Sequence, residues 1–281
     1  MSTVATDRSP GGSPLDAARW PVPRLECRCP GVRGQGRSVD AEPMRSGAPC
    51  VAAVVPAVHA IGTVSATSTG SFAPVFVKVC GITRPVDAVA AVEAGADAIG
   101  LNFVTTSRRC IDIQMAKGIL AVVPDHVMTV GVFRDHEANE VLEVTGVLGL
   151  DAVQLHGDLP PEFTAAVAAG VDTVIKAVVA ESSSLRSIDE HCADIVMLDA
   201  PHPGGGVPFD WDVVGDLVTK HKILLAGGLR PGNVAEAIRR VGPWGVDVAS
   251  GVEAEPPHKN PDAIALFLAE ARSAAEKPTK S

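Results

Sequence analysis

Residues 75–103 read VFVKVCGITRPVDAVAAVEAGADAIGLNF, and this stretch holds the pattern that decides the fold. The β-branched run at 75–80 predicts a buried strand. The alanine-rich stretch at 85–94 predicts a helix, which begins at a proline and stops at Gly95. A second apolar run at 98–103 predicts the next strand. A strand, a helix and another strand therefore follow one another with short connections.

The same alternation continues along the rest of the chain. Further strands are predicted at 127–133, 152–155, 173–178, 195–198, 223–226 and 245–248. Further helices are predicted at about 113–122, 136–148, 160–169, 184–190, 210–220, 231–241 and 260–275. Eight strands, each followed by a helix and apolar enough to be buried on both faces, predict an α/β fold, a closed parallel (β/α)8 TIM barrel. An open doubly wound sheet is the main alternative, and the number of strands favours the barrel.

The first part of the chain differs in composition from the rest. Residues 1–75 contain nine prolines, eight glycines and seven arginines but no lysine, and no period of 2 or 3.6 persists in them. We expect a disordered extension over 1–75, the catalytic barrel over 76–275 and a short tail over 276–281.

Charge and motif content narrow the classes of function. The formal net charge of −9 argues against nucleic-acid binding, which depends on Lys and Arg, and no apolar run is long enough for a membrane span. Six cysteines lack the spacing of a zinc site, so we expect no metal, and they fit a reducing, cytoplasmic location. The usual nucleotide-binding motifs, G-x-G-x-x-G and G-x-x-x-x-G-K-[ST], are absent from the sequence. Small molecules are the expected partners.

Two glycine-containing pairs mark a candidate phosphate site. Gly227 and Gly228 follow the seventh predicted strand, and Ser250 and Gly251 follow the eighth. Glycine lets backbone N–H groups approach an anion closely, and barrels of this type often bind phosphate at these two loops. Each pair alone is ordinary turn chemistry, but both together predict a phosphorylated substrate.

Polar residues at the other strand ends are candidates for catalysis. Cys80 ends the first predicted strand and Asp199 follows the sixth, so a thiolate and a carboxyl group can face each other across a substrate. A buried thiol and a loop carboxylate are the plain structural alternatives. The other polar residues at strand ends are Asn102, Arg109, His156, Asp158 and Asp247.

Seven segments together resemble one enzyme family. They are K-V-C-G-I-T at 78–83, E-A-G-A-D-A-I-G at 93–100, S-R-R at 107–109, A-V-Q-L-H-G-D at 152–158, F-D-W at 209–211, L-A-G-G-L at 225–229 and D-V-A-S-G-V-E at 247–253. In this order and spacing they resemble the phosphoribosylanthranilate isomerases of tryptophan biosynthesis, over about residues 76–270.

The resemblance implies a reaction and an acid–base pair. The reaction is an Amadori rearrangement without a cofactor, from N-(5′-phosphoribosyl)anthranilate to 1-(2-carboxyphenylamino)-1-deoxy-D-ribulose 5-phosphate. Asp199 matches the family's general acid, which opens the ribose ring to a Schiff base. Cys80 matches the general base, which as a thiolate removes the C2′ proton. Lys78 is a candidate for lowering the thiol pKa, although it is also an ordinary strand lysine if it points elsewhere.

The resemblance also implies a substrate-binding set. Arg109 matches the arginine that meets the anthranilate carboxylate, and the phosphate is expected on the four loop residues named above. Asp247 either positions the substrate or holds loop amides. Gln154 and His156 are equally open between substrate contact and a structural role. We expect a monomer or a homodimer.

Three departures from the family pattern leave alternatives open. The loop at 203–208 reads P-G-G-G-V-P and lacks the usual polar residues, Ala249 replaces a serine, and Thr105 and Thr106 replace Pro-Lys. A sugar-phosphate isomerase of shifted specificity and a non-catalytic phosphate-binding barrel are the two alternatives. The second has no need of an acid and a base placed across the mouth of the barrel.

Overall fold

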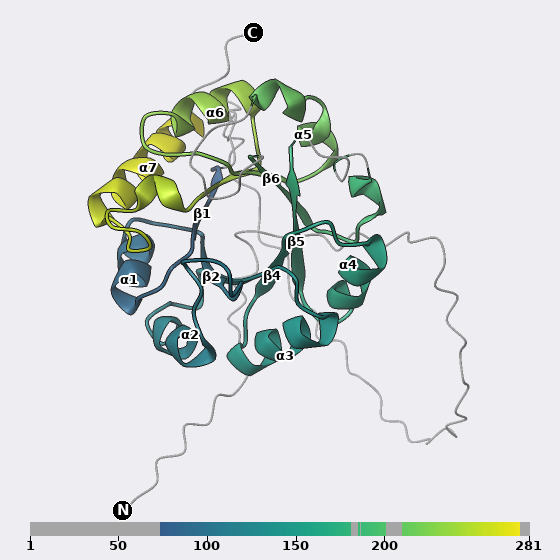
Figure 1. Ribbon diagram of the computed structural model, residues 1–281. Coiled ribbons are helices and arrows are strands. Elements are labelled where there is room, and N and C mark those ends of the chain that lie inside the picture. Colours follow the sequence, from purple (N-terminus) through teal and green to yellow (C-terminus); the bar gives the residue numbers. More distant parts are fainter. Residues whose placement is uncertain (1–73, 181–184, 186, 201–209, 276–281) are drawn as a thin grey trace, which may run out of the picture. The chain divides into compact units, whose positions relative to one another are not determined.

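The computed structural model describes residues 74–180, 185, 187–200 and 210–275. Almost all of the expected extension, the tail at 276–281 and the loop at 203–208 lie outside the described residues. Eight parallel strands pair in sequence order, and the barrel closes where Phe76 of the first strand pairs with Gly245 of the eighth. Figure 1 shows helices surrounding this ring of strands. The predicted (β/α)8 barrel is confirmed.

The elements alternate along the whole described part. The strands are β1 (Phe76–Cys80), β2 (Ala98–Asn102), β3 (Met128–Phe133), β4 (Ala152–Leu155), β5 (Thr173–Val179), β6 (Ile195–Asp199), β7 (Ile223–Leu225) and β8 (Gly245–Val248). The α-helices are α1 (Pro85–Glu93), α2 (Ile113–Leu120), α3 (Ala138–Leu148), α4 (Pro161–Ala168), α5 (Leu217–Lys220), α6 (Val234–Val241) and α7 (Pro261–Ala275). Short 3-10 helices lie at η3 (Ile188–Glu190), η4 (Trp211–Val214) and η5 (Ser250–Val252). Within these ranges no helix has the length and apolar character needed to cross a membrane.

Each strand lies within one residue of its predicted position. The agreement has a physical cause, because the strands of a closed parallel barrel are covered on both faces and therefore appear in the sequence as continuous apolar runs. The first helix also begins and ends as predicted, with proline at its first turn and Gly95 just beyond it at φ 89°.

Two predicted helices are wrong. Within 184–190 the described residues are in 3-10 or turn conformation, including η3, and form no α-helix. Within 210–220 the chain forms η4 and then the single-turn helix α5, because Gly215 between them has φ 43° and ψ −128°, which no helix accommodates. The backbone turn at this glycine therefore divides the predicted helix at 210–220 into two short pieces.

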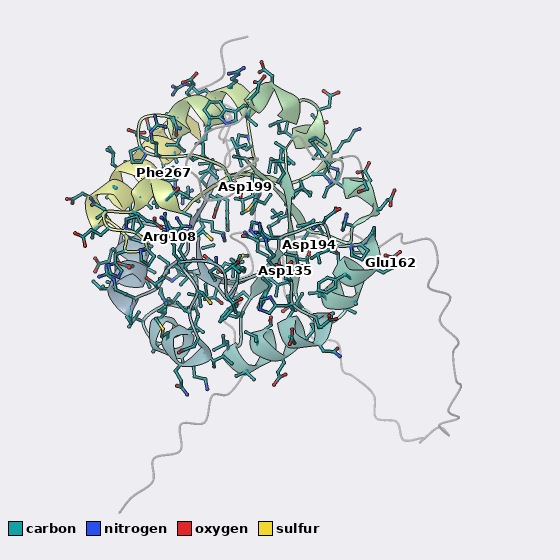
Figure 2. All side chains as sticks on the ribbon, in the orientation of Figure 1. Arg108, Asp135, Glu162, Asp194, Asp199 and Phe267 are labelled. Carbon is teal, nitrogen blue, oxygen red and sulfur yellow. The ribbon has the colours of Figure 1, made fainter. Side chains whose placement is uncertain are left out.

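The barrel interior has an apolar floor and a polar mouth. Near the amino ends of the strands, the rings of Phe76 and Trp244 stack at 4.5 Å between centroids. The cluster of buried apolar residues that includes Phe76 also contains Ala98, Val130, Ala152, Ile175, Ala177, Ile195, Met197, Leu224 and Ala226. A second, larger cluster packs the strands against the helices. Figure 2 shows Asp199 near the centre of the ring and Phe267 on the surrounding helix α7.

Helix α7 is fixed to the beginning of the barrel. Arg272 donates a hydrogen bond to the carbonyl oxygen of Val75 and forms an ion pair with Asp97 at 2.6 Å. Asp97 also accepts a hydrogen bond from the backbone N–H of Val77 at 2.8 Å. These bonds join the last helix to the first strand, next to the seam where β1 and β8 close the barrel.

Candidate active site

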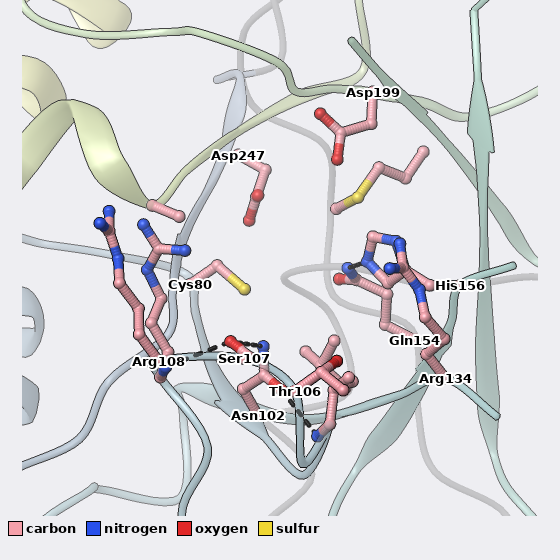
Figure 3. A pocket seen from close by; sticks show the side chains of 15 residues that line it. Cys80, Asn102, Thr106, Ser107, Arg108, Arg134, Gln154, His156, Asp199 and Asp247 are labelled. Atoms are coloured by element: carbon pink, nitrogen blue, oxygen red, sulfur yellow. Dashed lines mark hydrogen bonds between the residues drawn. The ribbon is translucent and has the colours of Figure 1, made fainter. Parts of the chain in front are cut away.

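A cavity of about 450 Å³ opens at the carboxyl ends of the strands. This is the end at which barrels of this type carry their active sites. Figure 3 shows its side chains converging from several strands and from the loop after β2. The lining residues are Cys80, Asn102, Val104, Thr106, Ser107, Arg108, Arg109, Val132, Arg134, Gln154, His156, Met197, Asp199, Asp247 and Ala249.

The predicted acid–base pair lies in this cavity. Cys80 ends β1 and Asp199 ends β6, and both side chains are buried. Burial raises the pKa of Asp199 to about 6, although its carboxylate accepts a hydrogen bond from the Ala200 N–H at 2.8 Å. Burial also raises the pKa of the Cys80 thiol, and the charge of Lys78 opposes that rise. The carboxyl group therefore retains a protonated fraction near neutral pH.

Lys78 points into the barrel beneath the thiol. Its side chain is fully buried, and its Nζ lies 2.9 Å from Oδ1 of Asp247 on β8. Gly100 on the neighbouring strand leaves the room for both groups, because a Cβ there would lie 2.7 Å from the Cys80 sulfur and 3.0 Å from the Lys78 nitrogen. The position of Lys78, which the sequence left open, thus places a cation next to the candidate base.

Arg109 is held by a carboxylate that the sequence reading did not single out. Its Nε lies 2.5 Å from Oε1 of Glu253 and its Nη2 lies 3.1 Å from Oε2, a bidentate ion pair. Arg108 and Lys259 contact the same carboxylate at 3.0 and 3.3 Å. Burial acts to raise the pKa of Glu253, but the hydrogen bonds and charges of Arg109 and Lys259 together outweigh it and keep that pKa below its usual value. Glu253 ends the last family-like motif, and its position there was the only available signal.

The loops after β7 and β8 lie against each other. A Cβ on Gly251 would come within 2.0 Å of the Leu229 carbonyl oxygen, so only glycine fits there. Gly227 and Gly228 adopt φ 78° and 72°, and within the described residues their N–H groups donate no hydrogen bond. Both loops join the carboxyl ends of their strands, but Gly227, Gly228, Ser250 and Gly251 do not line the cavity itself.

The wall formed by β3 and β4 carries three polar side chains, of which the sequence left Gln154 and His156 open and gave no signal for Arg134. Gln154 Nε2 lies 2.5 Å from Nε2 of His156, and Arg134 stands beside them in Figure 3. Burial, together with the charge of Arg134, lowers the pKa of His156 to about 3, so the imidazole is neutral. This wall therefore has one formal charge, that of Arg134.

Comparisons with known proteins agree with this geometry. The model of the family described as N-(5′-phosphoribosyl)anthranilate (PRA) isomerase matches residues 77–270. The isomerase of Pelobacter propionicus is 40% identical over 208 residues, which cover 73% of this chain and 99% of the relative.

Two solved structures are similar over the same region. A phosphoribosyl anthranilate isomerase in complex with reduced 1-(o-carboxyphenylamino)-1-deoxyribulose 5-phosphate has 38% identity and a TM-score of 0.65, covering 71% of this chain and 99% of that one. Monomers generated from the dimeric enzyme of Thermotoga maritima have 37% identity and a TM-score of 0.64, with the same coverage. The chain thus belongs to the N-(5′-phosphoribosyl)anthranilate isomerase family.

Proposed function

We propose that this protein converts N-(5′-phosphoribosyl)anthranilate to 1-(2-carboxyphenylamino)-1-deoxy-D-ribulose 5-phosphate, a step of tryptophan biosynthesis. The observation that carries the proposal is one cavity lined by Cys80, Asp199 and Arg109 at the carboxyl ends of the strands. A family member of known structure binds the reduced form of this product. A general acid, a general base and a carboxylate-binding arginine are the groups that the reaction requires.

Asp199 acts first, as the general acid. With a pKa of about 6, about one tenth of the carboxyl groups are protonated at pH 7. Asp199 gives its proton to the ribose ring oxygen as the C1′–O bond breaks. The anilino nitrogen supplies an electron pair to C1′, which leaves an open-chain iminium ion.

Cys80 acts second, as the general base. Its thiolate removes the proton from C2′, the electrons of that C–H bond form the C1′–C2′ double bond, and the iminium nitrogen regains its electron pair. The resulting enolamine then takes a proton at C1′ and loses the proton of its 2′-hydroxyl group, which gives the ketone. The positive charges of Lys78 and of the iminium favour the thiolate at this step, against the effect of burial on its pKa.

The remaining residues bind the substrate. Arg109 meets the anthranilate carboxylate with the N–H groups that Glu253 does not occupy. The backbone N–H groups of Gly227, Gly228, Ser250 and Gly251 receive the phosphate, as their position after β7 and β8 suggests. Asp247 lines the cavity while its Oδ1 holds Lys78, so it supports the base and contacts the substrate with its other oxygen.

The test follows the loss of phosphoribosylanthranilate fluorescence with the full chain, with the substrate generated in situ. The parent, Cys80→Ser and Asp199→Asn are compared with Arg239→Met, a change on the exposed side of α6. We expect turnover by the parent and the control and a loss of at least about a hundredfold in each site variant. A folded parent that binds the reduced product without turnover would refute the isomerase activity and favour the binding-barrel alternative.

Three further expectations belong to this proposal. Deletion of the residues before Pro74 leaves turnover unchanged if 1–75 is separate from the catalytic barrel at 76–275. Light scattering decides between a monomer and a homodimer, of which the Thermotoga maritima relative is the dimeric example. The cytoplasmic location is tested by fractionation of cells that produce the full chain.

A further inference from the structure

Arg134 enters the cavity from the end of β3, and no carboxylate of the described residues pairs with it. It is half-buried and lines the cavity together with Arg108 and Arg109. Both of those arginines are ion-paired with Glu253, whereas Arg134 makes no ion pair within the described residues. Its five N–H donors are therefore available to an anion inside the cavity.

The turn that carries Arg134 is fixed by its neighbours. Asp135 has φ 59°, a left-handed conformation that is costly for a residue other than glycine. His136 donates a hydrogen bond from Nδ1 to the Arg134 carbonyl oxygen at 2.7 Å. Its ring packs edge-on against that of Phe133, with 5.3 Å between the ring centroids. These contacts maintain the strained turn and, with it, the direction of the arginine.

An unpartnered acceptor lies on the same wall of the cavity as this cation. Gln154 is 1% exposed and lines the cavity, and its amide oxygen Oε1 has no hydrogen-bond partner within the described residues. Its amide nitrogen is engaged by His156, which Figure 3 shows between Gln154 and Arg134. A buried amide oxygen without a donor is costly unless a ligand supplies one.

We propose that Arg134 is a second arginine for the anthranilate carboxylate, in addition to Arg109, and that Gln154 Oε1 accepts the neighbouring anilino N–H. Anthranilate carries a carboxylate and an N–H group on adjacent ring carbons, which match a guanidinium and an amide oxygen on one wall. In the closed ring β3 and β4 lie opposite β7 and β8, where the phosphate is expected. A substrate with its phosphate at β7 and β8 therefore extends its aromatic end toward this wall. The inference rests on the proposed function.

The experiment compares two ligands on the full chain. The first is reduced 1-(o-carboxyphenylamino)-1-deoxyribulose 5-phosphate, and the second is the same compound made from aniline, which lacks the carboxylate. Dissociation constants are measured by calorimetry for the parent, Arg134→Met, Arg134→Lys, Gln154→Met and the exposed control Arg239→Met. Circular dichroism confirms that each variant is folded.

We expect Arg134→Met to weaken binding of the first ligand about 10- to 100-fold and binding of the second less than about twofold. Arg134→Lys recovers part of the loss because it keeps the charge but not the fork. Gln154→Met weakens both ligands by the same factor, since both carry the N–H group.

Equal losses for both ligands in Arg134→Met would show a structural role and overturn the inference. Unchanged binding of the first ligand would overturn it as well, and so would a parent that does not distinguish the two ligands. A parent that binds neither ligand would instead contradict the proposed function.

Discussion

Replacement of Asp199 by asparagine should make the protein inactive and more stable at once. The carboxyl group is buried at the end of β6, and its pKa rises from its ordinary value of 3.8 to about 6. Each unit of difference between the folded and unfolded pKa values corresponds to about 1.4 kcal/mol. The ionised carboxylate therefore costs the folded state about 3 kcal/mol. Asparagine keeps an oxygen for the Ala200 N–H bond and removes this cost.

The size of this stability gain depends on pH in a defined window. Well below pH 4 the carboxyl group is protonated in both states, and the variant and the parent should differ little. Between pH 4 and pH 6 the unfolded chain ionises while the folded protein resists, and the stability gain of Asp199→Asn should reach about 1.5 kcal/mol at pH 5. Above pH 6 the full gain of about 3 kcal/mol is present.

The assay is urea unfolding of the full chain, followed by circular dichroism at pH 4, 5, 6 and 8. Thermal unfolding at pH 8 should show a Tm higher by about 6 to 12 °C for a domain of this size. A gain that does not change with pH, or a loss of stability at pH 8, would refute the view that the acid is kept at a cost to folding.

Three other substitutions test separate parts of the structure. Lys78→Met should raise the pKa of Cys80 further, because it removes the charge that opposes the effect of burial. Alkylation of Cys80 by iodoacetamide at pH 7.5 should then be slower, about tenfold for each unit by which this pKa rises. An unchanged alkylation rate would contradict the role assigned to Lys78. Gly251→Ala should raise KM, because the new Cβ would meet a carbonyl oxygen at 2.0 Å and displace the loop after β8. Arg272→Met should lose about 1.5 to 3 kcal/mol in the free energy of unfolding with its bonds to Asp97 and the first strand, while kcat/KM stays at the parent value.

The fold was predictable because its signal is local. Each strand is a short apolar run, and a closed parallel barrel buries such runs on both faces. The helix at 210–220 was wrong because the backbone turn at Gly215 outweighs the helical preference of its neighbours. The 3.6-residue spacing of apolar side chains, from which helices are predicted, does not indicate such a turn.

The sequence predicted four of the residues that line the cavity, but it did not indicate Arg134, and the four loop residues expected to hold the phosphate do not line the cavity. Cys80, Asp199, Arg109 and Asp247 line one cavity because the strand ends of a barrel converge. The ion pairs of Lys78 and Arg109 join residues about 140 to 170 positions apart in the chain. The first depends on the register of β1 against β8, where Lys78 pairs with Asp247, and the second on how two loops fold over the mouth. The sequence supplied the charges but not the pairing.

The bond between Arg272 and the first strand has a consequence for how the chain is threaded. The described barrel begins at Pro74 and its last helix ends at Ala275, and the two ends are held side by side through Val75. A ring whose ends adjoin has no required starting point. A short linker across this seam, with new termini opened at the exposed residues Asp125 and His126 between α2 and β3, should give a circular permutant with the same eight strand pairings.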